Sequence, residues 1–557
     1  MTTRAEAIAT LTAPGQPYEL ETVPQYGVPC RAFKNAPRSL RKLYEETRSD
    51  LRFVAYEGEN YTFEDIWQRS SALASALVEA FGVRKGDRVA ISMRNYPEWI
   101  IAFEAATSIG AIAVAMNALW QPEEMEYGLR NCGARVLLAD QERLDRLALA
   151  EPVHGLSVIA VRPDKPLAAG VQSFEDILDR FAGTAMPEAD IAPEDDAIIF
   201  YTSGSTGHPK GVVSCHRSVL SSLYSWELDA RCAALVAGVE PAVPETQPAT
   251  LLAVPLFHAT GSHAVYLMSY RQQRRLVSMY KWDVAKAAAL IEAEQISSVV
   301  APSAMTGDLV AFAAREGRPL DSLVAVGGGG AARAPEQVRR IEQTFAKALP
   351  NTGWGMTETN AIGTGIGGQD YLDHPASSGR ASAVVDLRIV NEAGKELPPG
   401  QRGELQVRGI SVFRGYWERP DADAESFVER WLRTGDVAYL DDEGYLYIVD
   451  RIKDLVIRGG ENIGCGAVEA ALLEHPLVLE ASVYAVPDER LGEEVGATVY
   501  TSGPVSDDEL RAFLAPHLAA FEIPRYILFS DEPLPRTASG KILKRQLREE
   551  AARHLLG

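Results

Sequence analysis

Residues 201–211 read Tyr-Thr-Ser-Gly-Ser-Thr-Gly-His-Pro-Lys-Gly and follow the apolar run Ala-Ile-Ile-Phe at 197–200. The apolar run predicts a buried strand that delivers this stretch to a surface turn. Glycines let the backbone approach a ligand and expose its N–H groups, while the hydroxyls and Lys210 add donors and a positive charge. This chemistry suits a polyphosphate. The common P-loop pattern, Gly-x-x-x-x-Gly-Lys-[Ser/Thr], does not occur in the chain, and composition alone leaves a flexible Gly/Ser-rich turn open as the alternative.

The size and charge of the chain limit what kind of protein it is. Its 557 residues predict three or four compact units, at roughly 100 to 200 residues each. Hydrophobic residues make up 46% and charged residues 24%, as in an ordinary globular protein. The formal net charge is −21, which argues against nucleic acid or an anionic membrane as the main partner because both are negatively charged.

The cysteines predict neither a disulfide framework nor a zinc site. They are odd in number, scattered, and form no Cys-x-x-Cys pair. No apolar run approaches the ~20 residues of a membrane span, and the first residues lack the apolar core of a signal peptide. We therefore expect a cytoplasmic protein without an integral membrane segment. The five cysteines are Cys30, Cys132, Cys215, Cys232 and Cys465.

The pattern along the chain predicts an α/β fold with a second, smaller unit. Residues 1 to about 45 are Pro-rich and are expected to be an irregular arm. Strand and helix patterns then alternate, which predicts a large domain of mostly parallel sheets covered by helices. Short strands with turns at 383–449 indicate a small β-rich subdomain. We expect an N-terminal domain at 1–450, a hinge at 451–454 and a mobile α+β domain at 455–557.

The eleven residues at 201–211 resemble the phosphate-binding signature of the acyl-adenylate-forming (AMP-binding) superfamily, which includes acyl-CoA synthetases, luciferases and peptide-synthetase adenylation domains. All eleven positions fit that signature. The resemblance implies that the stretch binds the phosphates of ATP and that Thr206 and Lys210 take part in catalysis. The other ATP-binding residues that it implies here are Thr202, Ser203, Gly204, Ser205 and Gly207.

A second stretch, Pro255–Gly261, follows a predicted buried strand, so His258 is expected at a strand end where α/β proteins build sites. On position alone, a hydrogen-bonded core histidine is the more frequent outcome. The family resemblance implies that His258 instead orients the substrate carboxylate, and that Ala259, Thr260 and Gly261 line the acyl pocket. Peptide-synthetase domains carry an Asp soon after the matching aromatic residue, and this chain has none there. An amino acid substrate is therefore not expected.

The nucleotide-binding part of the resemblance continues at 353–359, Gly-Trp-Gly-Met-Thr-Glu-Thr, and at Asp436. Glu358 is expected to hold Mg²⁺, which prefers hard oxygen ligands, and to be catalytic. Asp436 is expected to accept hydrogen bonds from the ribose hydroxyls. Two loose dinucleotide-type glycine patterns, at 327–332 and 363–368, lack the strand, helix and acidic residue in order, and no helix is expected after the second. The remaining cofactor-binding residues that the resemblance implies are Gly330, Ala331, Ala332, Trp354, Gly355, Thr357 and Arg451.

The C-terminal motifs complete the resemblance. Lys453 matches the family's hinge residue, Gly459 and Gly460 match the loop that lines the thiol tunnel of CoA ligases, and Lys541 matches the catalytic lysine. The chain departs from the usual continuation of that loop, which concerns the thioester step and not adenylation. The departing residues are Gly464, Cys465 and Ala467.

At least six motifs occur in family order, so the sequence predicts an AMP-forming acyl-CoA synthetase that uses ATP, Mg²⁺ and coenzyme A. The preference for a medium- or long-chain or bulky apolar acid rests on Ala259, Thr260, Gly261 and Ala264, which would leave a roomy, mainly apolar pocket. Transfer to a carrier-protein phosphopantetheine is the main alternative, and a luciferase-like oxygenase is another. A non-catalytic relative would be expected to lack Lys541 or Glu358. No nucleic acid partner is expected, and a homodimer is left open.

Overall fold

The computed structural model describes residues 2–202, 208–240, 244–329, 333–459, 461–537 and 540–556. Its first element is helix α1 (Arg4–Leu11), which begins with a capping box between Thr3 and Glu6. A hairpin of β1 (Leu20–Gln25) and β2 (Val28–Phe33) follows, and α2 (Leu40–Glu46) leads into the large domain. This N-terminal segment packs α1 against the long central helix α8 (His216–Ala237).

An eight-stranded sheet carries the phosphate-binding stretch. Its order is β21-β11-β10-β6-β5-β7-β8-β9, and its strands are parallel from β10 to β9. Strands β11 and β21 add to its edge in antiparallel fashion. The strands in chain order are β5 (Arg88–Ser92), β6 (Ile112–Ala115), β7 (Val136–Asp140), β8 (Ser157–Val161), β9 (Gln172–Ser173), β10 (Asp196–Thr202), β11 (Lys210–Cys215) and β21 (Gly415–Tyr416).

A nine-stranded sheet forms the second half of the large domain, in the order β18-β17-β16-β15-β14-β12-β13-β3-β4. Its strands from β16 to β3 are parallel, and β17, β18 and β4 pair in antiparallel fashion. The strands are β3 (Arg52–Tyr56), β4 (Glu59–Thr62), β12 (Ala249–Leu252), β13 (Arg275–Ser278), β14 (Ser298–Ala301), β15 (Ala325–Gly328), β16 (Leu349–Thr352), β17 (Thr364–Gly367) and β18 (Arg380–Ala381).

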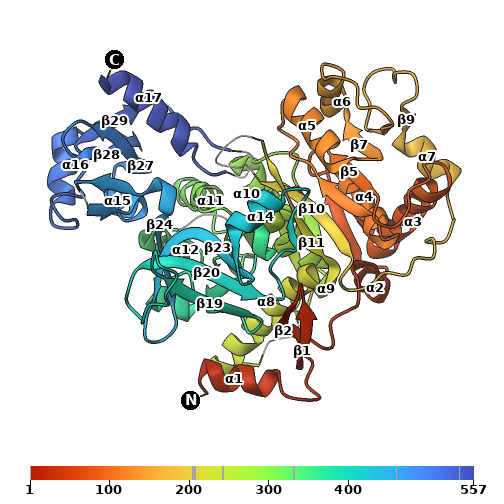
Figure 1. Cartoon of the computed structure of the whole chain (residues 1–557), viewed down its shortest axis with the longest axis horizontal. Helices are drawn as coiled ribbons and strands as arrows, with labels where there is room; N and C mark the ends of the chain where they lie inside the picture. Colours follow the sequence, from red (N-terminus) through yellow and green to blue (C-terminus); the bar gives the residue numbers. More distant parts are fainter. Residues whose placement is uncertain are drawn as a thin grey trace.

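Helices and both large sheets share one continuous hydrophobic core. Buried side chains of α3 and α4 belong to the same cluster as Val89 of β5 and Leu251 of β12. The two parallel sheets are therefore two halves of one large domain (Figure 1). The helices are α3 (Phe63–Glu79), α4 (Pro97–Ser108), α5 (Pro122–Cys132), α6 (Gln141–Leu147), α7 (Phe174–Arg180), the π-helix η1 (Thr260–Leu267), α9 (Met268–Gln272), α10 (Val284–Ala293), α11 (Ser303–Glu316), α12 (Pro335–Thr344), the 3₁₀ turn η2 (Thr357–Thr359) and α13 (Gln369–Asp373).

An antiparallel five-stranded sheet follows in the chain, as expected for 383–449. The C-terminal unit then forms a separate five-stranded sheet with its own core, at the blue end of Figure 1. The elements of the first sheet are β19 (Val385–Val390), β20 (Gly403–Gly409), α14 (Pro420–Ser426), β22 (Phe427–Val428), β23 (Trp431–Leu440) and β24 (Leu446–Arg451). Those of the second unit are η3 (Ile452–Asp454), β25 (Val456–Arg458), β26 (Glu461–Ile463), α15 (Cys465–Leu473), β27 (Val478–Asp488), β28 (Gly492–Thr501), α16 (Asp507–Leu514), β29 (Tyr526–Ser530) and α17 (Lys544–Leu556).

Two local expectations were wrong. Residues 1–45 are not irregular, because the Thr3–Glu6 capping box and the left-handed pair Tyr26–Gly27 give this segment a helix and a hairpin. A short helix, α13, does follow the second glycine pattern. Tyr371 of that helix is buried against Val338, and this packing outweighs the weak local helix signal.

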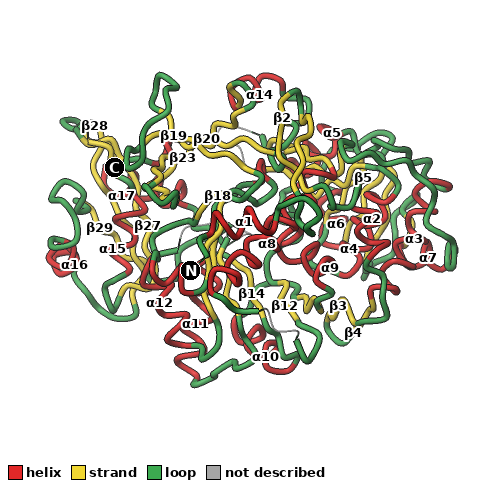
Figure 2. Tube along the Cα trace, turned by 90° about the horizontal axis from the view of Figure 1, so that it is seen from below, coloured by secondary structure: helices red, strands yellow, loops and turns green. Residues whose placement is uncertain are grey.

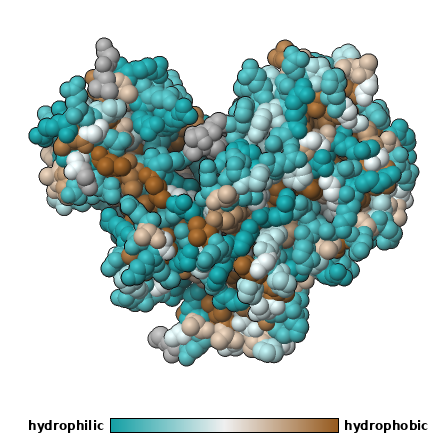
Figure 3. All heavy atoms as spheres, in the orientation of Figure 1, coloured by the Kyte–Doolittle hydropathy of each residue, from teal (hydrophilic) through white to brown (hydrophobic). Residues whose placement is uncertain are grey.

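Figure 2 shows strands and helices interleaved in the large domain and joined by loops at its surface. All five cysteines are buried and carry free thiols. Within the described ranges, no helix is long and apolar enough to span a lipid bilayer. The face in Figure 3 is mostly hydrophilic, with a notch between the lobe of the C-terminal unit and the rest of the molecule.

Candidate active site

The phosphate-binding stretch connects β10 to β11. Thr202 pairs with Lys210 across this antiparallel hairpin, and the Thr202 hydroxyl donates to the Lys210 carbonyl at 3.5 Å. Tyr201 fixes the strand by donating to Asn131 Oδ1 at 2.7 Å. Thr202 and Lys210 thus lie together where β10 ends. The remaining predicted phosphate ligands, Ser203, Gly204, Ser205, Thr206 and Gly207, lie outside the described residues.

Glu358 lies in the 3₁₀ turn η2 and is only 7% exposed. Its carbonyl accepts from Phe413 N–H at 2.8 Å, and its Oε1 accepts from the Tyr416 hydroxyl at 2.9 Å. Burial raises the pKa of the Glu358 carboxyl, and Tyr416, Arg451 and Lys210 partly offset this. The turn therefore holds a buried carboxylate beside positive charges.

Asp436 joins two of the predicted nucleotide residues. Its Oδ2 accepts from the Trp354 indole N–H at 2.8 Å, and its Oδ1 pairs with Arg451 Nε at 2.6 Å. Burial raises the pKa of Asp436, and the Arg451 charge is the largest opposing influence. Carboxylate oxygens have about four lone-pair sites in total, so ribose hydroxyls can still donate to Asp436. Stacking of adenine on Trp354 stays a prediction.

A glycine makes room for the Trp354 ring. A Cβ on Gly363 would lie 2.4 Å from Trp354 Cε3, and a Cβ on Gly355 would lie 2.6 Å from the Ala361 carbonyl carbon. Larger residues would clash at both positions. These glycines therefore support the close packing around the Trp354–Asp436 pair, which explains Gly363 without a dinucleotide fingerprint.

His258 lies in the turn between β12 and the π-helix η1, with its ring against Phe257. Burial, followed by the charge of Lys541, lowers the pKa of His258 to about 4. Gly261 is tightly enclosed, because a Cβ there would lie 2.2 Å from the Pro255 carbonyl oxygen. Thr260 faces Gly329, where an added Cβ would lie 3.7 Å from Thr260 Cγ2. The neutral imidazole is thus placed beside small residues.

Lys541 reaches this site from the C-terminal unit. It closes a turn in which Thr537 N–H donates to the Lys541 carbonyl at 2.7 Å, and Gly540 of the same turn lies against Pro302 and Met305 of the large domain. The side chain of Lys541 is in contact with solvent, but the protein around it displaces part of its hydration and so lowers the pKa of its ammonium. The positive charge of Arg451 lowers this pKa further. The carboxylates of Asp436 and Glu358 act on the pKa of Lys541 in the opposite direction.

The structure does not bring every predicted residue into this site. Gly459 adopts a left-handed conformation (φ +59°) and donates to the Leu491 carbonyl at 2.8 Å, within the C-terminal unit. Lys453 is exposed in η3, between β24 and β25. Thr357 is half-buried beside Glu358. The predicted residues Gly330, Ala331, Ala332 and Gly460 lie outside the described ranges.

The donor set fits a magnesium ion held together with a nucleotide. Glu358 supplies a hard carboxylate oxygen, Oε2, to which no donor from the described residues bonds. Those same residues contain no group of three or more His, Cys, Asp or Glu able to hold a metal by themselves. Mg²⁺ commonly binds through one or two carboxylates plus substrate phosphates and water. Glu358 is thus suited to hold the ion only in company with ATP.

Comparison with known proteins agrees with this geometry. The model of the AMP-binding enzyme family matches residues 42–417, and that of the AMP-binding enzyme C-terminal domain matches residues 467–541. The chain belongs to the AMP-binding enzyme family. One relative of this AMP-binding enzyme, a 2-succinylbenzoate–CoA ligase of Bacillus velezensis, is 32% identical over 89% of the chain and 94% of its own length. The long-chain-fatty-acid–CoA ligase FadD13 of Mycobacterium tuberculosis is 31% identical over 90% and 95%.

A solved structure also matches the enzyme. The o-succinylbenzoate–CoA synthetase of Bacillus subtilis, in complex with ATP and magnesium ion, aligns with a TM-score of 0.75 at 27% identity, over 91% of this chain and 98% of that one. The family and these relatives support an ATP-dependent, AMP-forming acid–CoA ligase. The expected α/β fold, with a large domain and a small C-terminal domain, is confirmed.

Sequence reasoning missed Tyr416, whose hydroxyl bonds Glu358 and whose ring lies 5.1 Å from Lys210 Nζ. Tyr416 is about sixty residues from Glu358 in the chain and two hundred from Lys210. No local pattern links residues so far apart. Only the pairing of β21 with β11 brings this tyrosine into the site of the AMP-binding enzyme.

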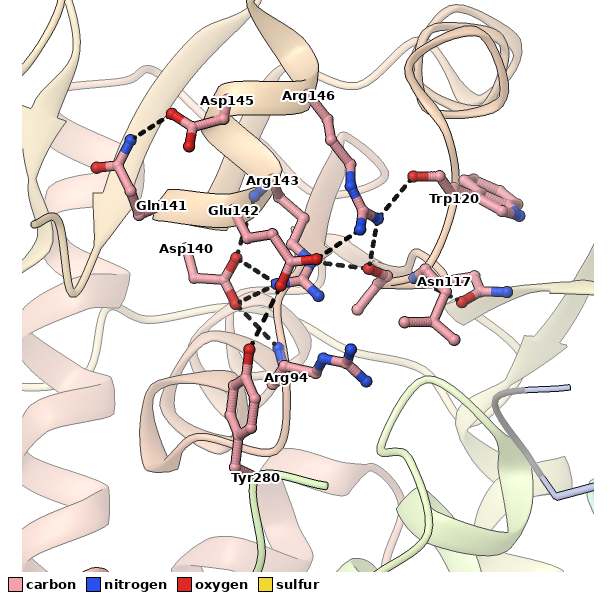
Figure 4. A network of polar contacts seen from close by, with 12 residues as sticks. Arg94, Asn117, Trp120, Asp140, Gln141, Glu142, Arg143, Asp145, Arg146 and Tyr280 are labelled. Carbon is pink, nitrogen blue, oxygen red and sulfur yellow. Dashed lines mark hydrogen bonds and ion pairs between the residues drawn. The ribbon is translucent and has the colours of Figure 1, made fainter. Parts of the chain in front are cut away.

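Sequence reasoning also missed a buried ionic network at the carboxyl ends of β5 and β7 (Figure 4). Asp140 Oδ1 pairs with Arg143 Nη1 at 2.9 Å, and its Oδ2 accepts from Arg94 N–H at 3.2 Å. Arg143 also donates to the Ala118 carbonyl at 2.8 Å. These bonds tie together the loops that follow β5, β6 and β7. Thr202 lies at the same end of the sheet, where the parallel strand β10 ends. The network therefore stabilises loops at the end of the sheet that carries the phosphate-binding stretch.

Proposed function

We propose that this enzyme activates a medium- or long-chain or bulky apolar carboxylic acid with MgATP and transfers the acyl group to coenzyme A. The observation that carries the proposal is that Gly540, next to Lys541 in the C-terminal unit, lies against Pro302 and Met305 of the large domain. The charge of Lys541 lowers the pKa of His258, and Asp436 and Glu358 act on the pKa of Lys541. Such a site collects positive charge and hydrogen-bond acceptors where a nucleotide and a carboxylate would meet. Gly459, whose N–H donates to the Leu491 carbonyl of its own unit, has no part in this adenylation step.

The chemistry needs this set of groups. A carboxylate oxygen attacks the α-phosphate of ATP, the bond to pyrophosphate breaks, and acyl-AMP forms. Negative charge on the acid and phosphates must be offset during the attack, and Lys541 and Lys210 supply positive charge there. Magnesium bound through Glu358 would offset phosphate charge further. Asp436 would orient the ribose, and the neutral His258 would hold the acid in place.

The second half-reaction requires a rearrangement. The thiolate of coenzyme A attacks the acyl carbonyl, and AMP leaves. We propose that the C-terminal domain, residues 455–557, rotates about the hinge at 451–454, which withdraws Lys541 and brings in the Gly459–Gly460 loop. The exposure of Lys453 and the arrangement of Lys541 and Gly459 support this order of events.

Lys453→Pro is expected to preserve acyl-AMP formation and abolish thioester formation, because proline restricts the backbone rotation that the hinge needs. Lys453→Ala, which removes the same charge but keeps the backbone free, is the matched control and should retain both half-reactions. Acyl-AMP and acyl-CoA are measured separately by mass spectrometry. Equal loss of both products in Lys453→Pro would count against the hinge.

The acid class is inferred from the small residues Ala259, Thr260 and Gly261, which follow His258. Ala259 and Thr260 leave space for an apolar body, whereas Gly261 faces the Pro255 backbone and adds none. None of the three offers a carboxylate to hold an amino group. The relatives named above act on an aromatic acid and on long-chain fatty acids, which is consistent with this class. Those relatives give no support to the carrier-protein alternative.

The experiment that tests the function is a product analysis. The enzyme is mixed with MgATP, coenzyme A and a panel of acids from acetate through fatty, aryl and polycyclic acids. Acyl-CoA and AMP from fatty or bulky apolar acids are the expected products. Acyl-AMP without thioester would point to a different acyl acceptor, and turnover of acetate alone would contradict the proposed acid class.

The pH dependence of adenylation is expected to reflect Lys541 and not His258. Lys541 is needed as the ammonium, so activity should fall as pH rises through its pKa, which lies below the ordinary 10.5. Because its pKa is lowered to about 4, His258 stays neutral at higher pH. The activity is therefore not expected to change near pH 6.5, the ordinary pKa of histidine. In Lys541→Arg the guanidinium keeps its proton, and the alkaline fall of any residual activity should disappear. A change in activity near pH 6.5 that disappears in His258→Gln would show that His258 titrates there and is not kept neutral.

The buried, unpaired thiols support a cytoplasmic location, which we keep as part of the proposal. Cys465 is buried and donates to the Asp454 carbonyl at 3.1 Å, so a packing role fits this residue better than a nucleophilic one. A homodimer stays a prediction.

A further inference from the structure

Tyr416 lies between two charged residues of the candidate site. It belongs to β21, the antiparallel edge strand beside β11, and pairs with Val212. Lys210 is two residues from Val212 on β11, so it shares a sheet face with the diagonal neighbour Tyr416. The distance from Lys210 Nζ to the centre of the Tyr416 ring is 5.1 Å. The hydroxyl at the other end of the ring donates to Glu358 Oε1 at 2.9 Å.

The position of Tyr416 is fixed by its own neighbours. Its backbone N–H donates to Asp423 Oδ1 at 2.7 Å, and its ring meets that of Phe413 edge-on at 4.8 Å. Phe413 N–H in turn donates to the Glu358 carbonyl. The segment 413–416 is therefore bonded to the turn that carries Glu358 through the backbone of Phe413 and through the side chain of Tyr416.

Each contact of Tyr416 has a distinct physical effect. The hydroxyl occupies one oxygen of the carboxylate and so fixes the plane of the carboxyl group. The face of the ring attracts the Lys210 ammonium and keeps it off the carboxylate. A direct ion pair between Lys210 and Glu358 would neutralise both groups and leave neither of them free to bind a ligand. Tyr416 thus leaves Oε2 of Glu358 and the Lys210 ammonium available to a ligand.

We propose that Tyr416 is a positioning residue that aims Glu358 at magnesium and Lys210 at phosphate. The inference rests on the proposed function, in which Glu358 holds the ion. Tyr416 itself touches neither ATP nor the acid in this account. Its hydroxyl acts through Glu358 and its ring acts through Lys210.

Tyr416→Phe tests the hydroxyl alone, because phenylalanine keeps the ring against Phe413 and Lys210. ATP binding is measured by calorimetry without any acid, so that no reaction occurs, with saturating Mg²⁺ and again with EDTA. We expect the gain in ATP affinity that Mg²⁺ provides to fall about tenfold, as for the loss of one hydrogen bond to a charged group. Affinity in EDTA and the melting temperature should be unchanged.

The matched control is Tyr61→Phe. Tyr61 is also half-buried and also donates to a glutamate oxygen, Glu59 Oε2, at 2.9 Å, but it lies at the far edge of the nine-stranded sheet. This control should leave ATP affinity unchanged with and without Mg²⁺. An equal loss of affinity in EDTA and in Mg²⁺ for Tyr416→Phe would overturn the inference, since a general loosening of the site would have that effect.

A double-mutant cycle with Glu358→Gln separates this inference from the proposed function. If Tyr416 acts through Glu358, adding Tyr416→Phe to Glu358→Gln should cause no further loss of the Mg²⁺-dependent gain. Fully additive losses would overturn the inference about Tyr416 alone. An intact Mg²⁺-dependent gain in Glu358→Gln would overturn the metal-binding role proposed for Glu358 and this inference with it.

Discussion

Replacing Lys541 by alanine is expected to lower the rate of acyl-AMP formation by about 10² to 10³, as for the loss of one charge-stabilising group in other enzymes. In the proposed reaction Lys541 supplies positive charge to the acid and the α-phosphate, and its charge already lowers the pKa of His258. When the acid attacks the α-phosphate, the local negative charge is highest, and water cannot replace an ammonium held in that position. The fold should be unaffected because the residue itself is exposed.

Exchange of radioactive pyrophosphate into ATP measures the adenylation step directly. The control is Lys395→Ala, which removes the same charge from an exposed turn of the β-rich subdomain and should leave the exchange rate unchanged. Melting temperatures of both variants should equal that of the parent enzyme. Unchanged exchange in Lys541→Ala would refute the catalytic role of Lys541 and, with it, the assigned reaction geometry.

The substitution Asp140→Ala is expected to destabilise the large domain by about 3 to 5 kcal/mol, as when a buried ion pair loses one partner. Arg143 is 1% exposed and would lose its buried partner at 2.9 Å, keeping only Glu142, whose side chain is 43% exposed, at 2.8 Å (Figure 4). The substitution also removes the N-cap of α6, because the Asp140 side chain accepts from Arg143 N–H. A clear fall in melting temperature is therefore expected.

Two further variants make this result specific. Asp145 lies in the same helix, but its ion pair with Lys165 is exposed, so Asp145→Ala should change stability by at most about 1 kcal/mol. Adding Arg143→Met to Asp140→Ala removes the buried guanidinium that lost its buried partner, and should recover part of the lost stability. A melting temperature for Asp140→Ala equal to that of Asp145→Ala would show that the buried pair does not stabilise the domain.

Local sequence patterns predicted most of the secondary structure, because their signals act over a few residues. The alternation of apolar runs and helix patterns predicted the parallel sheets, and the short strands predicted at 383–449 form the antiparallel five-stranded sheet. Apolar runs mark strands less exactly: the runs at 251–254 and 323–326 lie two residues away from the strands that form there, β12 (Ala249–Leu252) and β15 (Ala325–Gly328). The N-terminal hairpin was missed because its turn depends on a left-handed Tyr26, which no local rule favours.

The sequence by itself determined which functional groups are available to the site. Residues 201–211, 353–359 and the C-terminal Gly540–Lys541 are short motifs, and their residue types follow from what phosphate, magnesium and a carboxylate require. Only the tertiary structure decided how these motifs meet. Lys541 lies more than a hundred residues after Asp436, and Tyr416 reaches Glu358 and Lys210 solely because β21 adds to the edge of β11. Contacts between distant segments depend on sheet order and domain arrangement, and the spacing of residues along the chain encodes neither.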